Sequence, residues 1–416
     1  MISIRHILYF YIIVTILFSD VYIVVPWLRP LTIMNYMLVI VWFLYPRPLI
    51  DRKIYQLQQI VIIFILYMFA INFFQNDFQK TFSLLLSTWP IPFVLSIFSK
   101  YPKNDEMIFF YAKFYLLYNL IFSILQFSGI SITSGEILSK IPFLGVDRTF
   151  VDFGAQGLRI SGATSSTIGL ACMLGFIFIL FYYYRGGKLL SSVERKIYLA
   201  IILFLILLTQ TRSLIFALPL VIMVTNMMVS KKRTKAISFT LLGTIIFVIL
   251  VYLALPILMD TFPRLFLAAD QDGSIVHRLQ ANVFGSVGTF YLSPLIGVPF
   301  SEALHAMEVG YEKVGLFIGN YFISEVTHHN QIAYYFRYYG FIGLALFILL
   351  YVKMFKVALS PHKTEINKKI VFAIILFHFL YTLSHNNKWT MDYYLWIFIA
   401  LQLTDYSKKI KKGKRL

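Results

Sequence analysis

The segment HHNQIAYYFRYYGFIGLALFILLYV, residues 328–352, marks the place where a long polar stretch gives way to an apolar run. The apolar run at 331–352 is long enough to cross a bilayer core of ~30 Å as a helix. Another apolar run, 236–256, precedes the polar stretch, so residues 257–330 form one large loop between two predicted spans. Basic side chains gather in this loop, and we expect the chemistry there: Arg264, His277, Arg278, His305, His328 and His329.

The composition places the whole chain in the membrane class. Of its 416 residues, 59% are hydrophobic and only 13% are charged, which lies outside the range of soluble globular domains. We therefore predict an all-α polytopic membrane protein, a single integral membrane domain over residues 1–416 with about twelve transmembrane helices. The predicted spans are 7–27, 31–46, 57–75, 81–99, 107–128, 162–184, 197–210, 213–230, 236–256, 331–352, 370–386 and 393–406.

The net charge of +18 follows a pattern that is typical of membrane topology rather than of nucleic-acid binding. Lysines and arginines cluster beside alternate predicted spans, and such clusters mark the cytoplasmic side of a membrane protein. Both termini are therefore predicted to be cytoplasmic, and the large loop 257–330 and a second loop, 129–161, are predicted to face the periplasm. We expect contacts with membrane lipids, including anionic head groups, and no nucleic-acid partner. The clusters are Arg47/Arg52/Lys53, Lys100/Lys103, Arg185/Lys188/Arg195/Lys196, Lys231/Lys232/Arg233/Lys235, Lys353/Lys356/Lys363/Lys368/Lys369 and residues 408–415.

Three arginines on the predicted outer side are candidates for binding an anionic substrate, namely Arg159, Arg212 and Arg278. Snorkelling or head-group anchoring is the alternative for any lone arginine near an interface. Arg212 differs, because the turn Thr209–Ser213 joins two short predicted helices that cannot carry it fully out of a bilayer. A charge recessed in this way is by default a functional-site hypothesis. Guanidinium groups bind phosphate oxygens bidentately, so several of them around one cavity would hold a pyrophosphate.

His329 is the candidate for acid–base work, because the unperturbed pKa of histidine lies nearest neutrality. A hydrogen-bonded interface histidine is the alternative. Asn330 either orients the imidazole or caps the following helix, and His328 is a supporting neighbour. Gly340 and Gly343 have the spacing of close helix–helix contacts in membranes, which favours a packing role. A carboxylate base is also open from the sequence, from one of the loop glutamates Glu302, Glu308, Glu312 and Glu325.

Other functional classes find little support. The sequence contains no G-x-x-x-x-G-K-[ST] segment for nucleotide hydrolysis, no H-E-x-x-H segment and no Cys/His set with zinc spacing. We therefore expect no metal and no cofactor. The single cysteine, Cys172, excludes an internal disulfide. Asp20 and Lys113 lie in predicted spans and could belong to the ion path of a transporter, but pairing within the fold explains them equally well.

Four segments of the chain, in order, resemble the O-antigen polymerase and ligase superfamily. The last of them contains His329 and Asn330, then Gly340 after nine residues and Gly343 after two more. This segment fits the H-[NSQ]-x9-G-x2-[GTY] pattern of the O-antigen ligases and is similar to related motifs in the wider superfamily. The resemblance covers roughly residues 115–350.

The other three segments lie upstream. Arg159–Gly162 resembles the RxSG element of the family. Thr209–Arg212 resembles its arginine motif before a span, often written R-x3-L, with Phe216 here in the leucine position. Arg278 followed by Ser293–Val298 is similar to the family segment written "R…nPl.GvG".

The resemblance implies a metal-independent membrane glycosyltransferase of GT-C-type architecture. It implies the bacterial inner (cytoplasmic) membrane as the location, with an active site that faces the periplasm. The implied donor is an oligosaccharide repeat unit on undecaprenyl pyrophosphate. By this carry-over Arg212 and Arg278 bind the pyrophosphate, with Arg159 as a further member, and His329 activates the attacking sugar hydroxyl.

The acceptor distinguishes the two branches of the family. A polymerase joins the glycan to another lipid-linked repeat unit and makes O-antigen or capsular polysaccharide, whereas a ligase transfers it to the lipid A core of lipopolysaccharide. The motif around His329 favours a ligase. The aromatic fifth span ending at Ile124–Phe127 and the Arg159 segment favour a polymerase, which we prefer. A lipid-linked oligosaccharide flippase is the remoter alternative, and a chain-length-regulating co-polymerase is a partner that the polymerase interpretation allows.

Overall fold

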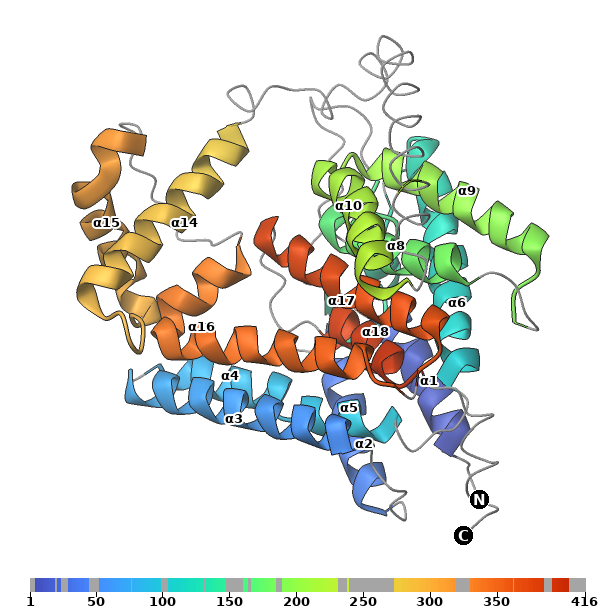
Figure 1. Cartoon of the computed structure of the whole chain (residues 1–416), viewed down its shortest axis with the longest axis horizontal. Coiled ribbons are helices and arrows are strands. Elements are labelled where there is room, and N and C mark those ends of the chain that lie inside the picture. Colours follow the sequence, from blue (N-terminus) through green and yellow to red (C-terminus); the bar gives the residue numbers. More distant parts are fainter. Residues whose placement is uncertain are drawn as a thin grey trace.

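The computed structural model is built almost entirely of helices (Figure 1). It describes residues 4–18, 21–23, 29–44, 52–75, 77–98, 104–130, 132–146, 160–163, 166–184, 189–230, 238, 273–318, 330–361, 363–384 and 391–403. Almost all of the predicted span 236–256 lies outside the described residues, as do the loop segments 147–159, 257–272 and 319–329.

Most of the helices are long and apolar, and two short strands form a small sheet. In chain order the elements are α1 (Ile4–Leu17), β1 (Val21–Ile23), α2 (Pro30–Leu44), α3 (Arg52–Phe74), α4 (Phe78–Thr88), α5 (Ile91–Ile97), α6 (Asn104–Phe127), α7 (Ser134–Leu138), β2 (Leu144–Val146), α8 (Thr167–Tyr183), α9 (Ser192–Thr209), α10 (Arg212–Val229), α14 (Gly273–Leu292), the 3-10 helix Phe300–Glu302, α15 (Ala303–Ile318), α16 (Gln331–Ala358), α17 (Glu365–Ser384) and α18 (Met391–Leu401).

Five helices in the described part of the chain are long and apolar enough to cross a membrane, which agrees with the predicted all-α membrane class. They are Lys53–Phe74, Asp105–Phe127, Arg212–Val229, Gln331–Ala358 and Glu365–Leu383. Shorter apolar helices accompany them at Ile4–Leu17, Pro30–Leu44, Leu86–Ile97 and Thr167–Tyr183. The number of twelve spans and the GT-C-type architecture stay predictions.

The first predicted span, 7–27, is wrong in its second half. Helix α1 ends at Leu17, and β1 follows and pairs antiparallel with β2, which lies in the predicted loop 129–161. The polar pair Ser19–Asp20 interrupts the apolar run, and Pro26 cannot continue a helix. The β-branched and aromatic residues between them suit a strand, because its backbone groups find partners in β2.

Two other predicted spans have different boundaries. The span 81–99 is divided between α4 and α5, and Trp89–Pro90 lies at the junction, where proline lacks the N–H that a continuous helix needs. The span 197–210 starts too late, because α9 begins at Ser192. Ser191 and Glu194 form a capping box there, which satisfies backbone donors at the helix start and extends it beyond the apolar run.

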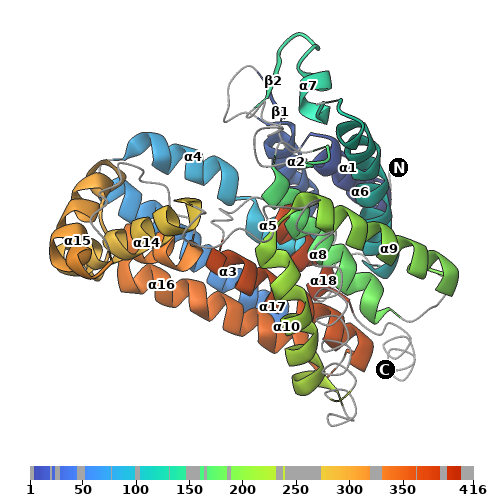
Figure 2. The ribbon, with the colours of Figure 1, turned by 90° about the horizontal axis from the view of Figure 1, so that it is seen from above.

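Helix packing divides the molecule into a main bundle and a peripheral helix pair. In the main bundle, α3 and α16 lie side by side, and α17 packs on α8, α10 and α16 (Figures 1 and 2). Aromatic side chains fill its core; for example, the rings of Tyr111 and Trp396 stack with centroids 4.7 Å apart. The pair α14 and α15 packs against α16 and lies toward one side of the bundle (Figure 1).

Helices α14 and α15 are antiparallel and approach each other backbone to backbone. A Cβ atom on Gly288 would lie 1.6 Å from the Ala306 carbonyl oxygen, and one on Gly310 would lie 1.9 Å from the Phe284 carbonyl oxygen. Only glycine permits this approach. Residues 273–318, within the predicted loop 257–330, therefore contain a closely packed pair of helices.

Candidate functional site

Helix α16 is broken at Gly340, where φ is 61° and ψ is −163°. Only glycine adopts this backbone conformation without strain. The backbone N–H of Phe341 donates to the Pro294 carbonyl at 2.8 Å, instead of continuing the helix. The carbonyl of Arg337 in turn accepts from the Val298 N–H at 2.8 Å. The turn after α14 thus supplies the partners that the broken helix would otherwise lack.

This contact, which we call the α16 break (Pro294–Val298 against Arg337–Ile342), needs a glycine on each side. A Cβ atom on Gly340 would lie 2.2 Å from the Leu295 carbonyl carbon. Gly297 has a φ of +81°, and a Cβ atom on it would lie 2.4 Å from the carbonyl carbon of Tyr338. The predicted packing role of Gly340 is therefore correct, but the partner is a loop backbone rather than a neighbouring helix.

Groups from three elements, α3, α15 and α16, meet around the α16 break. Tyr67 of α3 donates its hydroxyl to the Tyr339 carbonyl at 2.8 Å, and the Asn72 amide lies 3.3 Å from the Tyr339 hydroxyl. Arg337 is fully buried, and its guanidinium donates to the carbonyl of Ala303 at the start of α15. The break is thereby tied to α3 and to the α14–α15 pair.

The first turn of α16 shows which of two roles Asn330 takes. Its Oδ1 accepts from the backbone N–H groups of Ile332 at 2.8 Å and Ala333 at 3.3 Å, which is an N-cap. His329 and His328 precede this cap and lie outside the described residues. The cap determines where α16 begins, and so it determines where the chain carrying His329 joins the helix.

Gln331 is a residue that the sequence pattern did not single out. Its side chain is fully buried, and its Nε2 lies 3.3 Å from the Tyr335 hydroxyl. Its Oε1 accepts no hydrogen bond from any described residue. Packing alone does not require a buried amide at this position, two residues after His329. In the sequence, this residue could have been noticed as a glutamine at the start of an otherwise apolar run.

Arg278 belongs to α14, and its side chain lies outside the described residues. Helix α14 packs on α15 and α16, so the helix that carries Arg278 contacts the helix that His329 precedes. On α15, His305 is exposed and lies 3.7 Å from Glu308. The loop glutamates Glu302 and Glu308 are also exposed there.

Arg212 is the first residue of α10 and is half-buried. The turn before it is packed inside the protein, since Thr209, Gln210 and Thr211 are all buried. Gln210 adopts a left-handed conformation, with φ at 50°, that ends α9 and reverses the chain. Helix α9 is longer than the predicted span 197–210, whereas α10 has the predicted length, and each helix has 18 residues. The turn is thus buried within the protein, and its recessed position in the membrane stays a prediction.

The segment after Arg159 contacts the end of α9. Arg159 itself lies outside the described residues, but the Ile160 N–H donates to the Leu208 carbonyl at 3.3 Å. Gln126 of α6 holds the same segment, because its Oε1 accepts from the N–H groups of Ser161 and Gly162 at 3.0 Å each. The structure thus brings the first two motif segments together. Sequence reasoning noted Gln126 only as part of an aromatic span.

Lys113, considered above for an ion path, is engaged within the fold. Its Nζ donates to the Leu189 carbonyl at 3.1 Å and lies 3.8 Å from the Glu194 carboxylate. The Ser191 N–H and hydroxyl, together with Lys113, hold the pKa of Glu194 below its ordinary value. These contacts favour a structural role for Lys113, whereas Asp20 lies outside the described residues.

Helix α17 contacts two of the helices that carry motif segments. Segment 160–163 and the start of α10 form one pair, and the α16 break forms the other. Helix α17 packs on both α10 and α16. Helix α17 therefore connects α10, which begins with Arg212, with α16, which contains the break at Gly340.

The described residues contain no group of three or more His, Cys, Asp or Glu side chains that could hold a metal ion. The absence of a metal and of a cofactor stays a prediction. Comparison of the chain with protein-family models and with curated protein sequences gives no match. The resemblance to the O-antigen polymerase and ligase superfamily therefore rests on the four motif segments alone and stays a prediction.

Proposed function

We propose that this protein is a membrane glycosyltransferase that polymerises oligosaccharide repeat units carried on undecaprenyl pyrophosphate. The reaction takes place at the periplasmic face of the bacterial inner membrane, and the product is O-antigen or capsular polysaccharide. One structural observation carries most weight beside the sequence resemblance. The turn Pro294–Val298 is hydrogen-bonded into the α16 break at Gly340.

This observation supports the proposal because two segments that the resemblance identifies separately form one structural unit. The turn follows α14, which carries Arg278, and the break lies in α16, which His329 precedes. Backbone hydrogen bonds between the turn and the break fix the position of α14 relative to α16. A site in which a bound anion and a base act on one substrate requires such rigid support.

In the proposed reaction, the guanidinium groups of Arg212 and Arg278, with Arg159, bind the pyrophosphate of the donor. His329 takes the proton of the acceptor hydroxyl while its oxygen forms a bond to the anomeric carbon of the donor glycan. The bond between that carbon and the pyrophosphate oxygen breaks, and the electron pair leaves with undecaprenyl pyrophosphate. The arginines stabilise the charge that develops on this leaving group.

The glycans of a strain that lacks this protein test the proposal. A polymerase predicts that single repeat units are found on the lipid A core. Long polymer stranded on the carrier lipid would instead identify a ligase. Repeat units stranded on the inner side of the membrane would identify a flippase. An unchanged glycan profile would contradict all three.

A further inference from the structure

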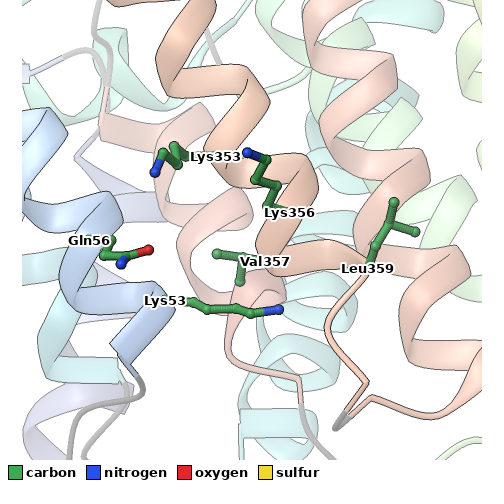
Figure 3. A pocket seen from close by; sticks show the side chains of 6 residues that line it. All are labelled: Lys53, Gln56, Lys353, Lys356, Val357 and Leu359. Carbon is green, nitrogen blue, oxygen red and sulfur yellow. The ribbon is translucent and has the colours of Figure 1, made fainter.

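A pocket of about 270 Å³ lies between the start of α3 and the end of α16, far along α16 from the break at Gly340 (Figure 3). Six residues line it: Lys53, Gln56, Lys353, Lys356, Val357 and Leu359. Lys53 and Gln56 lie on α3, Lys353, Lys356 and Val357 lie on α16, and Leu359 follows the end of α16 (Figure 3). Three lining residues are lysines and none is acidic, so this pocket concentrates positive charge.

Two lysines outside the pocket, at this end of the molecule, have protein partners. Lys369 lies 3.0 Å from the Glu365 carboxylate, and buried Lys363 donates to carbonyls at the end of α18. Lys353 and Lys356 make no ion pair with any residue that the structure describes. They are three positions apart on one helix, where like charges repel. With the third lysine of the pocket close by, an anion between the two helices would offset this repulsion.

The surroundings of the pocket are apolar and exposed. Leu359 at its edge is 42% exposed, Val352 of α16 is 42% exposed, and Tyr55 of α3 is 51% exposed. Such side chains suit acyl chains, whereas a water-soluble phosphate compound would leave them without a partner. The volume lies just below the ~300–1,000 Å³ of typical small-molecule sites, which fits a head group better than a nucleotide or a glycan.

We infer that this pocket binds the phosphate group of an anionic phospholipid, whose acyl chains lie along the exposed apolar faces of α3 and α16. The basic clusters predict that this end of the molecule is cytoplasmic, so the lipid belongs to the inner leaflet. Lysine ammonium groups donate hydrogen bonds to phosphate oxygens, and Gln56 adds an amide donor. The site is independent of the proposed glycosyltransferase reaction, which uses the other side of the membrane.

Native mass spectrometry of the purified full-length protein in detergent tests this inference. The probe is phosphatidylglycerol, compared with phosphatidylcholine and with inorganic phosphate as competitor. The test variant is Lys353→Gln/Lys356→Gln. The matched control is Lys368→Gln/Lys369→Gln, which removes the same charge from the same end without changing the pocket. If the test variant is not monodisperse, Lys53→Gln replaces it.

We expect the wild-type protein and the control to retain phosphatidylglycerol in preference to phosphatidylcholine. The test variant should bind it about 30-fold more weakly, since each lysine near an anionic surface contributes a factor of roughly five. Lys53→Gln alone should weaken binding about fivefold. Equal retention by pocket and control variants would overturn the inference. Displacement of the lipid by millimolar inorganic phosphate would overturn the assignment of the pocket to a phospholipid. Neither result depends on glycan transfer.

Discussion

Replacing Gly340 by alanine tests whether the α16 break holds the α14–α15 pair on the bundle. The new Cβ atom would lie 2.2 Å from both the carbonyl carbon and the carbonyl oxygen of Leu295. These are backbone atoms, so no side-chain rotation relieves the overlap. Either the turn Pro294–Val298 moves away or α16 changes its course.

The cost has two parts. An alanine at φ 61° and ψ −163° carries strain of about 1–3 kcal/mol. Movement of the turn also breaks the bonds from Phe341 to Pro294 and from Val298 to Arg337, each worth about 0.5–1.5 kcal/mol. Because one displacement causes both losses, the parts do not add fully, and we expect a destabilisation of about 2–5 kcal/mol.

The measurement is the thermal unfolding midpoint of the purified protein in detergent, beside the glycan profile of cells that express the variant. We expect the midpoint to fall by roughly 2–6 °C and the long-chain glycan to disappear. Gly129→Ala is the matched control, because Gly129 also has a positive φ of 86° but nothing lies within 4 Å of an added Cβ atom. If Gly340→Ala behaves no differently from Gly129→Ala, the break does not hold the turn.

Three further predictions concern topology and chemistry. A cysteine placed within 257–330, in a parent without the native cysteine, should be labelled from the periplasmic side; labelling only after the inner membrane is permeabilised would reverse the topology. Arg212→Lys and Arg278→Lys should each lose most activity at normal expression, because lysine keeps the charge but not the bidentate geometry; glycan ladders like those of the wild type would return both arginines to an anchoring role. His329→Ala should slow transfer by ~10²–10⁴-fold while His328→Ala is mild, as general-base loss implies. Exchanged phenotypes for the two histidines would show that the motif is matched in the wrong register.

The sequence predicted helix positions well where hydropathy alone decides them. The predicted span 107–128 corresponds to α6 at Asn104–Phe127, and 213–230 corresponds to α10 at Arg212–Val229. It failed where partners distant in the chain decide the conformation. Strand β1 replaces part of a predicted helix because β2 pairs with it, and no local pattern in an apolar run reports such a partner.

In the candidate site, too, residue type predicted local structure, and contacts with distant segments were not predicted. The cap at Asn330 is one of the two roles that its residue type predicted, and the structure shows it. The break itself could not be foreseen, because Gly340 lies in a run whose hydropathy reads as one continuous helix. It depends on hydrogen bonds from a turn more than forty residues upstream. Gln126 was likewise unrecognised, because its partners Ser161 and Gly162 are distant in sequence.

The central claim is that this chain itself transfers a glycan from a polyprenyl pyrophosphate. The direct test incubates the purified full-length protein, in a chelator, with the lipid-linked repeat unit that accumulates in the deletion strain. We expect glycans of two or more repeats on the carrier lipid, with one polyprenyl pyrophosphate released for each new linkage and no turnover by Arg278→Lys. A folded wild-type protein that leaves the repeat unit unchanged, with and without lipid A core as acceptor, would contradict the account.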